Sequence, residues 1–167
     1  TRHWSFGHDA PGVRALLEPL AASPQGGPID VARLMPPFVR ARINTFPPIG
    51  APEYDCFWSS LHFFTEGEPD TRLLSDQEFN VEILRSYVPV PPGETRFGDV
   101  LVFYGPGDVP IHAVNVIAPG VVFTKNGNSF RRPWHFARTE TIRERYMATQ
   151  VIRPWRLRRL ANTDGAN

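Results

Sequence analysis

The chain has 167 residues and a formal net charge of +1, and 41% of its residues are hydrophobic. This size and composition are typical of one globular domain that buries about two-thirds of its unfolded surface. The near-neutral charge argues against a general role in binding nucleic acid or a membrane surface. The single cysteine excludes an intrachain disulfide and a zinc site built from several cysteines.

No apolar run in the sequence approaches the roughly 20 residues that a membrane span needs. The chain begins at Thr1 rather than Met, so we expect a processed product whose export signal has been removed. A periplasmic or secreted location follows from that expectation. We also expect a monomer without a metal ion or other cofactor. The basic segment 153–159 is interpreted as a solvated end or an anion-seeking arm, not as a nucleic-acid site.

Residues 1–50 are predicted to form accessory helices and a lead-in to the main domain, residues 51–167. A first helix is expected to open near Asp9, with an apolar face that ends before residue 23. A second short helix over residues 30–35 stops at two prolines. Residues 38–46 alternate loosely between apolar and polar, and the proline-rich segment 47–52 follows. The two parts are expected to form one compact unit.

The main domain is expected to open with a helix that starts at Cys56. Asp55 precedes the cysteine as a candidate cap, and an apolar run follows. The N–H groups and the macrodipole at a helix start favour an anion, which lowers the pKa of a thiol. The alternative remains open, because a lone cysteine is more often a small buried hydrophobic residue.

The next helix carries a capping box in which Ser75 is the cap and Glu78 lies three residues further on. Its apolar stripe consists of Phe79, Ile83, Leu84 and Tyr87. The prolines of segment 88–93 then impose an extended crossing.

From residue 98 onward the pattern indicates β structure. Runs over 100–104, 112–117 and 121–125 have the length and composition of strands, and the last two are joined as a hairpin. A helix is expected over 138–147, with inward residues Ile142, Tyr146 and Met147. A final strand over 149–155 is placed at a sheet edge, because Pro154 lacks an N–H. Helices followed by a small antiparallel sheet predict an α+β fold.

A histidine that opens a strand is a suitable partner for the thiol. His112 follows a loop rich in Gly and Pro, where we expect its ring to be held rigidly yet reachable by solvent. His112, Val114 and Val116 share one face of the strand. If that face packs on the Cys56 helix, the ring points at the sulfur, and the pair can serve as nucleophile and base.

A third residue that orients the imidazole is expected on the returning strand. A two-residue turn at 119–120 pairs Ala118 with Val121, and counting back places His112 opposite Gly127. The candidate orienting residues are therefore Asn126, which is the nearest by register, and its rivals Thr124 and Asn128. Asn126 can equally be a plain turn residue before a glycine.

These features, taken in order, resemble the NlpC-type and CHAP-type cysteine peptidases and amidases, which have a papain-like fold. The resemblance rests on Asp55-Cys56 opening an apolar helix, on Gly98-Asp99 before an apolar strand, and on His112 opening a strand with a hairpin return. It covers roughly residues 50–130. The family commonly has Ser-Gly after the cysteine, where this chain has Phe57-Trp58, so the near wall of the cleft is expected to be bulkier.

The resemblance implies that Cys56 is the nucleophile, His112 the base, and the polar residue on the next strand the third member. It implies amide hydrolysis through a thioester, with peptidoglycan stem peptides as the substrate. Tyr54 is a candidate donor to the oxyanion, and Trp58 a candidate wall of the substrate site. Two alternatives remain: a catalytically inactive domain that binds a peptide or cell-wall fragment, and a thioester acyltransferase.

Two further groups carry weaker signals. His62 lies off the helical face of the cysteine and is interpreted as a core or surface histidine. The run Trp134-His135-Phe136 either lines the cleft or belongs to the core.

Overall fold

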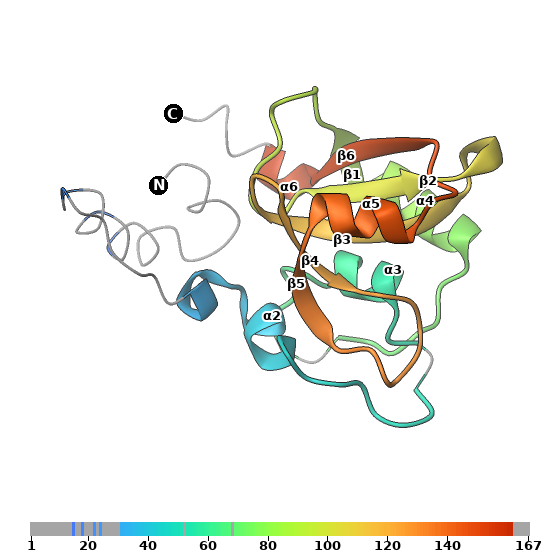
Figure 1. Cartoon of the computed structure of the whole chain (residues 1–167), viewed down its shortest axis with the longest axis horizontal. Helices are drawn as coiled ribbons and strands as arrows, with labels where there is room; N and C mark the ends of the chain where they lie inside the picture. The colour runs from blue at the N-terminus through green and yellow to red at the C-terminus, as the bar shows by residue number, and fades with distance from the viewer. Residues whose placement is uncertain are drawn as a thin grey trace.

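A computed structural model describes residues 15, 18, 22, 24, 31–51, 53–67 and 69–161. The helix expected to open near Asp9 lies almost entirely outside these residues. The described chain has an α+β fold, as predicted, and it contains one antiparallel sheet with the strand order β1-β6-β2-β3-β4-β5 (Figure 1). No helix in the described part of the chain is both long enough and apolar enough to cross a membrane.

The sheet is formed by β1 (Tyr87–Pro89), β2 (Val100–Tyr104), β3 (Pro110–Ala118), β4 (Val121–Lys125), β5 (Trp134–Arg138) and β6 (Val151–Leu157). The α-helices are α2 (Pro37–Arg42), α3 (Cys56–Leu61), α4 (Asp76–Ser86), α5 (Thr139–Arg145) and α6 (Arg158–Ala161). Two short 3₁₀ helices, η1 (Val31–Leu34) and η2 (Pro106–Asp108), complete the described elements.

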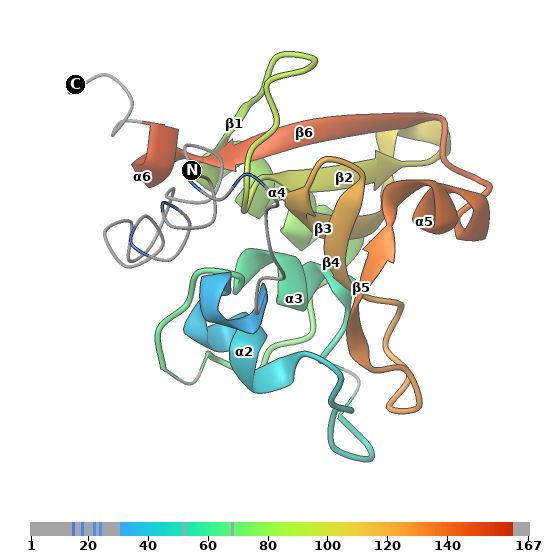
Figure 2. The ribbon, with the colours of Figure 1, turned by 60° about the vertical axis from the view of Figure 1, so that its left-hand side comes forward.

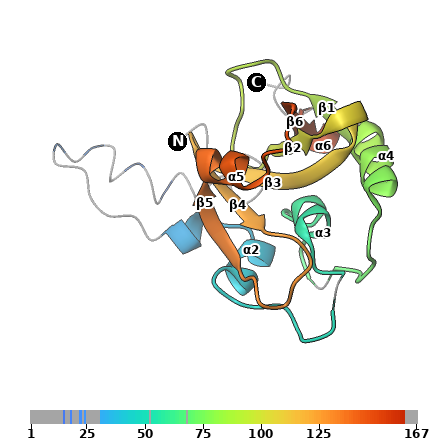
Figure 3. The same ribbon diagram turned by 45° about the vertical axis from the view of Figure 1, so that its right-hand side comes forward.

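Helices cover both sides of the sheet (Figures 1 and 3). On one side α3 and α4 meet through the stacked rings of Phe57 and Phe79, whose centroids are 4.2 Å apart, and they pack on Val102 of β2. On the other side α5 packs through Ile142 on Phe103 of β2. Neighbouring residues of one strand therefore face different helices, as the two-residue period of a strand requires.

The described part of residues 31–50 shares the core of the main domain. Segment 38–46, whose pattern alternates loosely, begins as helix α2. Leu34 and Phe38 pack in one cluster with Trp58 of α3 and Phe123 of β4. Figure 2 shows α2 next to α3 on the same side of the sheet.

The two caps expected from the sequence are present. Asp55 accepts a hydrogen bond from the N–H of Trp58 at 2.8 Å, so α3 begins at Cys56. Ser75 and Glu78 form the predicted capping box at the start of α4. These signals are local in sequence, which is why they could be interpreted without the tertiary structure.

The placement of the final strand at a sheet edge is wrong, because β6 lies between β1 and β2 (Figure 2). Pro154 pairs with Leu101 of β2, and its carbonyl accepts from the N–H of Val90. In an antiparallel ladder the N–H and C=O of one residue point to the same side. The missing N–H of Pro154 thus faces β1 opposite Val90, at the end of the β1–β6 pairing, so only the terminal bond of this ladder is lost.

The predicted turn of the hairpin is correct, but the predicted register beyond it is wrong by one residue. Ala118 pairs with Val121 as expected, whereas Val116 pairs with Val122 because a bulge at Ile117 interrupts the ladder. Continuing this count places His112 opposite Asn126 and not opposite Gly127. A single extra residue shifts every later pair, and the turn sequence does not encode it.

Two other expectations differ from the structure near the C-terminal end. β5 was not predicted as a strand; it pairs along its whole length with β4. The helix expected over 138–147 is α5, which is shorter, and Met147 is 88% exposed and not inward. Ile142 is buried, as predicted.

A buried ion pair fixes the turn before β2. The carboxylate of Asp99 accepts two hydrogen bonds from Arg156 of β6, at 2.8 and 2.9 Å, and one from the N–H of Arg96 at 2.7 Å. Gly98 precedes it with a φ of +86°, and a Cβ at this position would collide with the ring of Phe64. This turn therefore requires glycine, and the hydrogen bonds of Asp99 to Arg156 and Arg96 fix its conformation.

Candidate functional site

Cys56 lies at the start of α3, with its side chain directed toward β3. It shares a buried cluster with Ala113, the residue that directly follows His112. The backbone N–H of Ala113 acts to lower the pKa of the thiol. The last β3–β4 pair on this side is Asn115 with Phe123, so the sulfur meets β3 where β4 no longer pairs with it.

The expected lowering of the thiol pKa is wrong. Burial, together with the charge of Asp55, raises the pKa of Cys56 to about 12. The N–H groups of Ala113, Cys56 and Phe57 act in the expected, lowering direction but are outweighed. Only 5% of the residue is exposed. The thiol is therefore neutral at neutral pH, because desolvation exceeds the stabilisation available at a helix start.

The face of β3 expected to meet the cysteine is also wrong. Ala113 faces Cys56, whereas Val114, which shares the face of His112, packs with Ile142 of α5. The ring of His112 accordingly lies on the α5 side of the sheet. It stacks on Tyr146 with centroids 3.9 Å apart and planes inclined by 12°. The sulfur and the ring approach the same stretch of β3 from opposite sides.

His112 is fully buried, which contradicts the expected access to solvent. Burial, together with the charges of Arg145 and His135, lowers the pKa of His112 to about 3. Its Nε2 lies 3.0 Å from the hydroxyl of Thr124. Its Nδ1 has no hydrogen-bond partner among the described residues. A proton on Nε2 would leave the lone pair on Nδ1, which is the tautomer that a base requires.

The contact of His112 thus goes to Thr124, one of the rivals considered for the third position, and not to Asn126. The side-chain amide of Asn126 contacts the Nε2 of His135 at 3.3 Å instead. Asn128 is exposed on the turn after β4. The one-residue change in register accounts for the contact with Thr124, because it brings this residue diagonally opposite His112 on the same face. Asn126, which the same count places directly opposite His112, lies beyond the end of β4.

Two buried charged groups accompany the sulfur. Burial raises the pKa of Asp55 to about 6, although backbone N–H groups and Lys125 oppose this rise. Lys125 is fully buried and donates to the carbonyls of Gly127 and Ser129, at 2.8 and 2.9 Å. Burial lowers the pKa of Lys125 to about 8, against the opposing charges of Asp55 and Cys56. Charged side chains are rarely buried without a function or a partner.

Tyr54 and Trp58 lie on the α2 side of α3. Tyr54 is half-buried and packs edge-on against Trp58, with centroids 4.7 Å apart. Trp58 is buried, and its indole N–H donates to the carbonyl of Asp70 at 2.6 Å. The structure therefore groups these two side chains with each other and with Trp134, while Ala113 lies against the sulfur.

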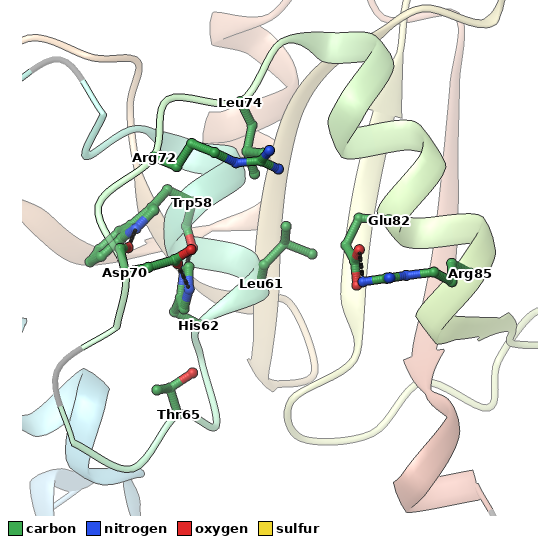
Figure 4. A pocket seen from close by; sticks show the side chains of 9 residues that line it. All are labelled: Trp58, Leu61, His62, Thr65, Asp70, Arg72, Leu74, Glu82 and Arg85. Carbon is green, nitrogen blue, oxygen red and sulfur yellow. Dashed lines mark hydrogen bonds and ion pairs between the residues drawn. The ribbon is translucent and has the colours of Figure 1, made fainter.

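A pocket of about 410 Å³ lies between α3 and α4 (Figure 4). Its lining consists of Trp58, Leu61, His62, Thr65, Asp70, Arg72, Leu74, Glu82 and Arg85. The Nδ1 of His62 donates to the carbonyl of Trp58 at 2.8 Å, and its Nε2 lies 3.2 Å from the carboxylate of Asp70. The lining does not include Cys56 or His112, so this pocket is separate from the thiol.

Sequence reasoning missed Tyr146 as a neighbour of His112, and it did not identify Lys125 as a buried charge near the sulfur. The sequence carries no signal for the first, because 34 positions separate Tyr146 from His112 and α5 brings them together. For Lys125, the available signal was a charged residue at the end of an otherwise apolar strand. Within the described residues no three His, Cys, Asp or Glu side chains are grouped so that they could hold a metal ion.

Comparison with known proteins places the chain in no family: no protein-family model, no curated protein and no solved structure matches it significantly.

Proposed function

We propose that the chain is a cysteine hydrolase that cleaves an amide bond, with Cys56 as the nucleophile and His112 as the base. The observation that carries this proposal is that a buried thiol and a buried imidazole approach the same stretch of β3. The imidazole lies 3.0 Å from the hydroxyl of Thr124, and its Nδ1 has no partner among the described residues. Buried titratable groups with shifted pKa values concentrate at functional sites.

In this mechanism the reaction starts from a neutral thiol and a neutral imidazole. Because the sulfur and the ring approach β3 from opposite sides, this mechanism requires a movement that brings Nδ1 of His112 to the thiol when the substrate binds. His112 then removes the proton from Cys56 as the sulfur attacks the carbonyl carbon, and the backbone N–H of Cys56 stabilises the oxyanion. The proton then passes from His112 to the leaving amine, and the C–N bond breaks. Water hydrolyses the resulting thioester with His112 again as the base, which releases the acid and restores the thiol.

Thr124 takes the orienting role for which Asn126 was the first candidate. Its hydroxyl holds Nε2 and so leaves Nδ1 to act as the base. The resemblance to NlpC-type and CHAP-type enzymes favours peptidoglycan stem peptides as the substrate. The burial of the sulfur requires the substrate to displace the side chains that cover it.

Replacing Cys56 tests the proposal directly. Peptidoglycan digestion, measured as newly released amino groups, should fall to background in C56A and in C56S, a loss of at least about a thousandfold. The matched control is H62Q, which alters the separate pocket and should retain activity. Undiminished digestion by C56A would refute the assignment.

A second candidate function is a catalytically inactive binding domain. It is favoured by the 5% exposure of Cys56 and by the 410 Å³ pocket that lies elsewhere. The rate of Cys56 alkylation by iodoacetamide at pH 7 separates the two functions. A thiol that transfers its proton to His112 reacts at a rate that H112Q reduces, whereas an inert structural thiol reacts only on unfolding.

A further inference from the structure

Two arginines stand beside the Cys56–His112 pair without contributing to the mechanism above. Arg132 belongs to the connection between β4 and β5, and one of its guanidinium nitrogens donates to the carbonyl of Asn126 at 3.3 Å. Arg145 is the last residue of α5 and directly precedes Tyr146, the ring that stacks on His112. Both arginine side chains are exposed.

Electrostatic effects link both arginines to the same group of side chains. Burial, together with the charge of Cys56, raises the pKa of Tyr146 to about 12, while the charges of Arg145 and Arg132 oppose this rise. The pKa of Lys125, lowered chiefly by burial, is also lowered by Arg132. Arg132, bonded to the carbonyl of Asn126, and Arg145, next to the ring that stacks on His112, therefore lie near the same buried group on two different elements.

Neither guanidinium is neutralised within the described part of the chain. Ion pairs link other exposed arginines to carboxylates there, such as Arg153 to Asp108 at 2.8 Å and Arg72 to Glu78 at 3.5 Å. No such pair is formed by Arg132 or Arg145 with a described residue. Residues 131–159 contain nine arginines and only two glutamates. Positive potential is thus left available at this side of the site.

We propose that the substrate of the thiol site carries a carboxylate or a comparable anionic group close to the scissile bond, and that Arg132 and Arg145 bind it. This inference rests on the proposed function and defines the class of substrate. A guanidinium presents a planar fork of donors that matches a carboxylate, and it remains charged at any physiological pH. A substrate that is neutral near the scissile bond would gain nothing from two unpaired guanidinium groups.

The test compares two alkylating probes of similar size but different charge: iodoacetate, which is an anion, and iodoacetamide, which is neutral. Cys56 is the only cysteine, so each rate reports on one site. Both probes attack the same thiolate, so the ratio of their rate constants cancels the thiolate fraction and the accessibility of the sulfur. We expect the iodoacetate-to-iodoacetamide ratio to exceed that of glutathione by about threefold or more at low salt. It should decrease toward the glutathione value as salt increases.

Variants assign the effect to the two arginines. R132Q and R145Q should each lower the ratio by about twofold to threefold. The matched control is R143Q, which removes a charge from the same helix as Arg145 and should leave the ratio unchanged. Circular dichroism and thermal melting verify that each variant is folded.

Equal ratios in the wild type, R132Q and R145Q would overturn the proposal. Failure of both probes to label the folded protein would overturn it as well, since an anionic group could then not reach the site. The ratio is measured without turnover, so it is independent of the hydrolase assignment. If C56A retained digestion while the iodoacetate-to-iodoacetamide ratio changed as expected, the hydrolase assignment would be refuted and the anion site would be retained.

Discussion

Two buried polar clusters of this molecule differ in how completely their polar groups are paired. The Asp99 cluster consists of Asp99, Arg96 and Arg156, and each oxygen of its carboxylate accepts a hydrogen bond from Arg156. The Cys56 cluster consists of Asp55, Cys56, His112, Thr124 and Lys125. In it, Nδ1 of His112 has no partner among the described residues, and the pKa values of four of its members are shifted by burial.

This difference in pairing distinguishes the Asp99 cluster, which is structural, from the Cys56 cluster, which is the candidate functional site. A paired charge with its hydrogen bonds made has nothing left to offer a ligand, so the Asp99 cluster joins β2 to β6. Groups held buried without complete pairing raise the free energy of the folded state, and they persist where a reaction or a ligand needs them. Experiments that perturb each cluster should therefore give different kinds of result.

The largest effect is expected from breaking the Asp99 cluster. D99N leaves the Arg156 guanidinium buried without its counter-charge, which should lower the free energy of unfolding by about 3–5 kcal/mol. Urea denaturation measures this loss. The control R153M breaks the exposed pair with Asp108 and should lose less than about 1 kcal/mol. A loss as small for D99N as for R153M would contradict the assigned role of the cluster.

The next effect concerns the pH dependence contributed by Asp55. Burial raises its folded-state pKa to about 6 from 3.8, so the folded protein retains a proton that the unfolded chain releases. Stability should fall as the pH rises from about 4 to about 6, by about 3 kcal/mol in total. D55N keeps a cap at the start of α3 and should lack this fall.

Urea denaturation of the wild type and D55N at several pH values between 4 and 7 measures the difference. The two curves should separate progressively up to about pH 6 and then run parallel, with D55N the more stable protein. Curves that run parallel throughout would show that the folded environment of Asp55 does not disfavour its charge.

The smallest effect is expected at Thr124. T124V keeps the shape of the side chain but removes the hydroxyl next to His112, so a buried ring nitrogen loses its partner. We expect a loss of about 1–3 kcal/mol in stability and about a tenfold decrease in hydrolysis. T124S restores the hydroxyl and should recover most of both quantities. Equal activity of T124V and the wild type would refute the orienting role proposed for Thr124.

The features predicted correctly from the sequence are those set by neighbouring residues. The cap at Asp55, the capping box at Ser75 and the turn before Val121 each depend on a few consecutive positions. Together with the strand pattern they were sufficient for an α+β fold with Cys56 at a helix start. They also placed His112 on a strand next to that helix.

What could not be predicted depends on tertiary structure. The bulge at Ile117 shifts the register and puts Thr124 on the face of His112, whereas Asn126 lies beyond the end of β4 and contacts His135. The thiol pKa is decided by burial, which a local pattern does not give. Pro154 indicated an edge strand, but the short β1 allows a proline inside the sheet.

The central position of β6 has a consequence for how the protein is made. This strand separates β1 from β2, yet it is synthesised after every other strand of the sheet. While the ribosome is still translating residues 126–150, β1 and β2 each lack a neighbour and expose unpaired backbone groups. We expect the thiol to be chemically accessible on such nascent chains, and the sheet to close only once the arginine-rich final strand has emerged.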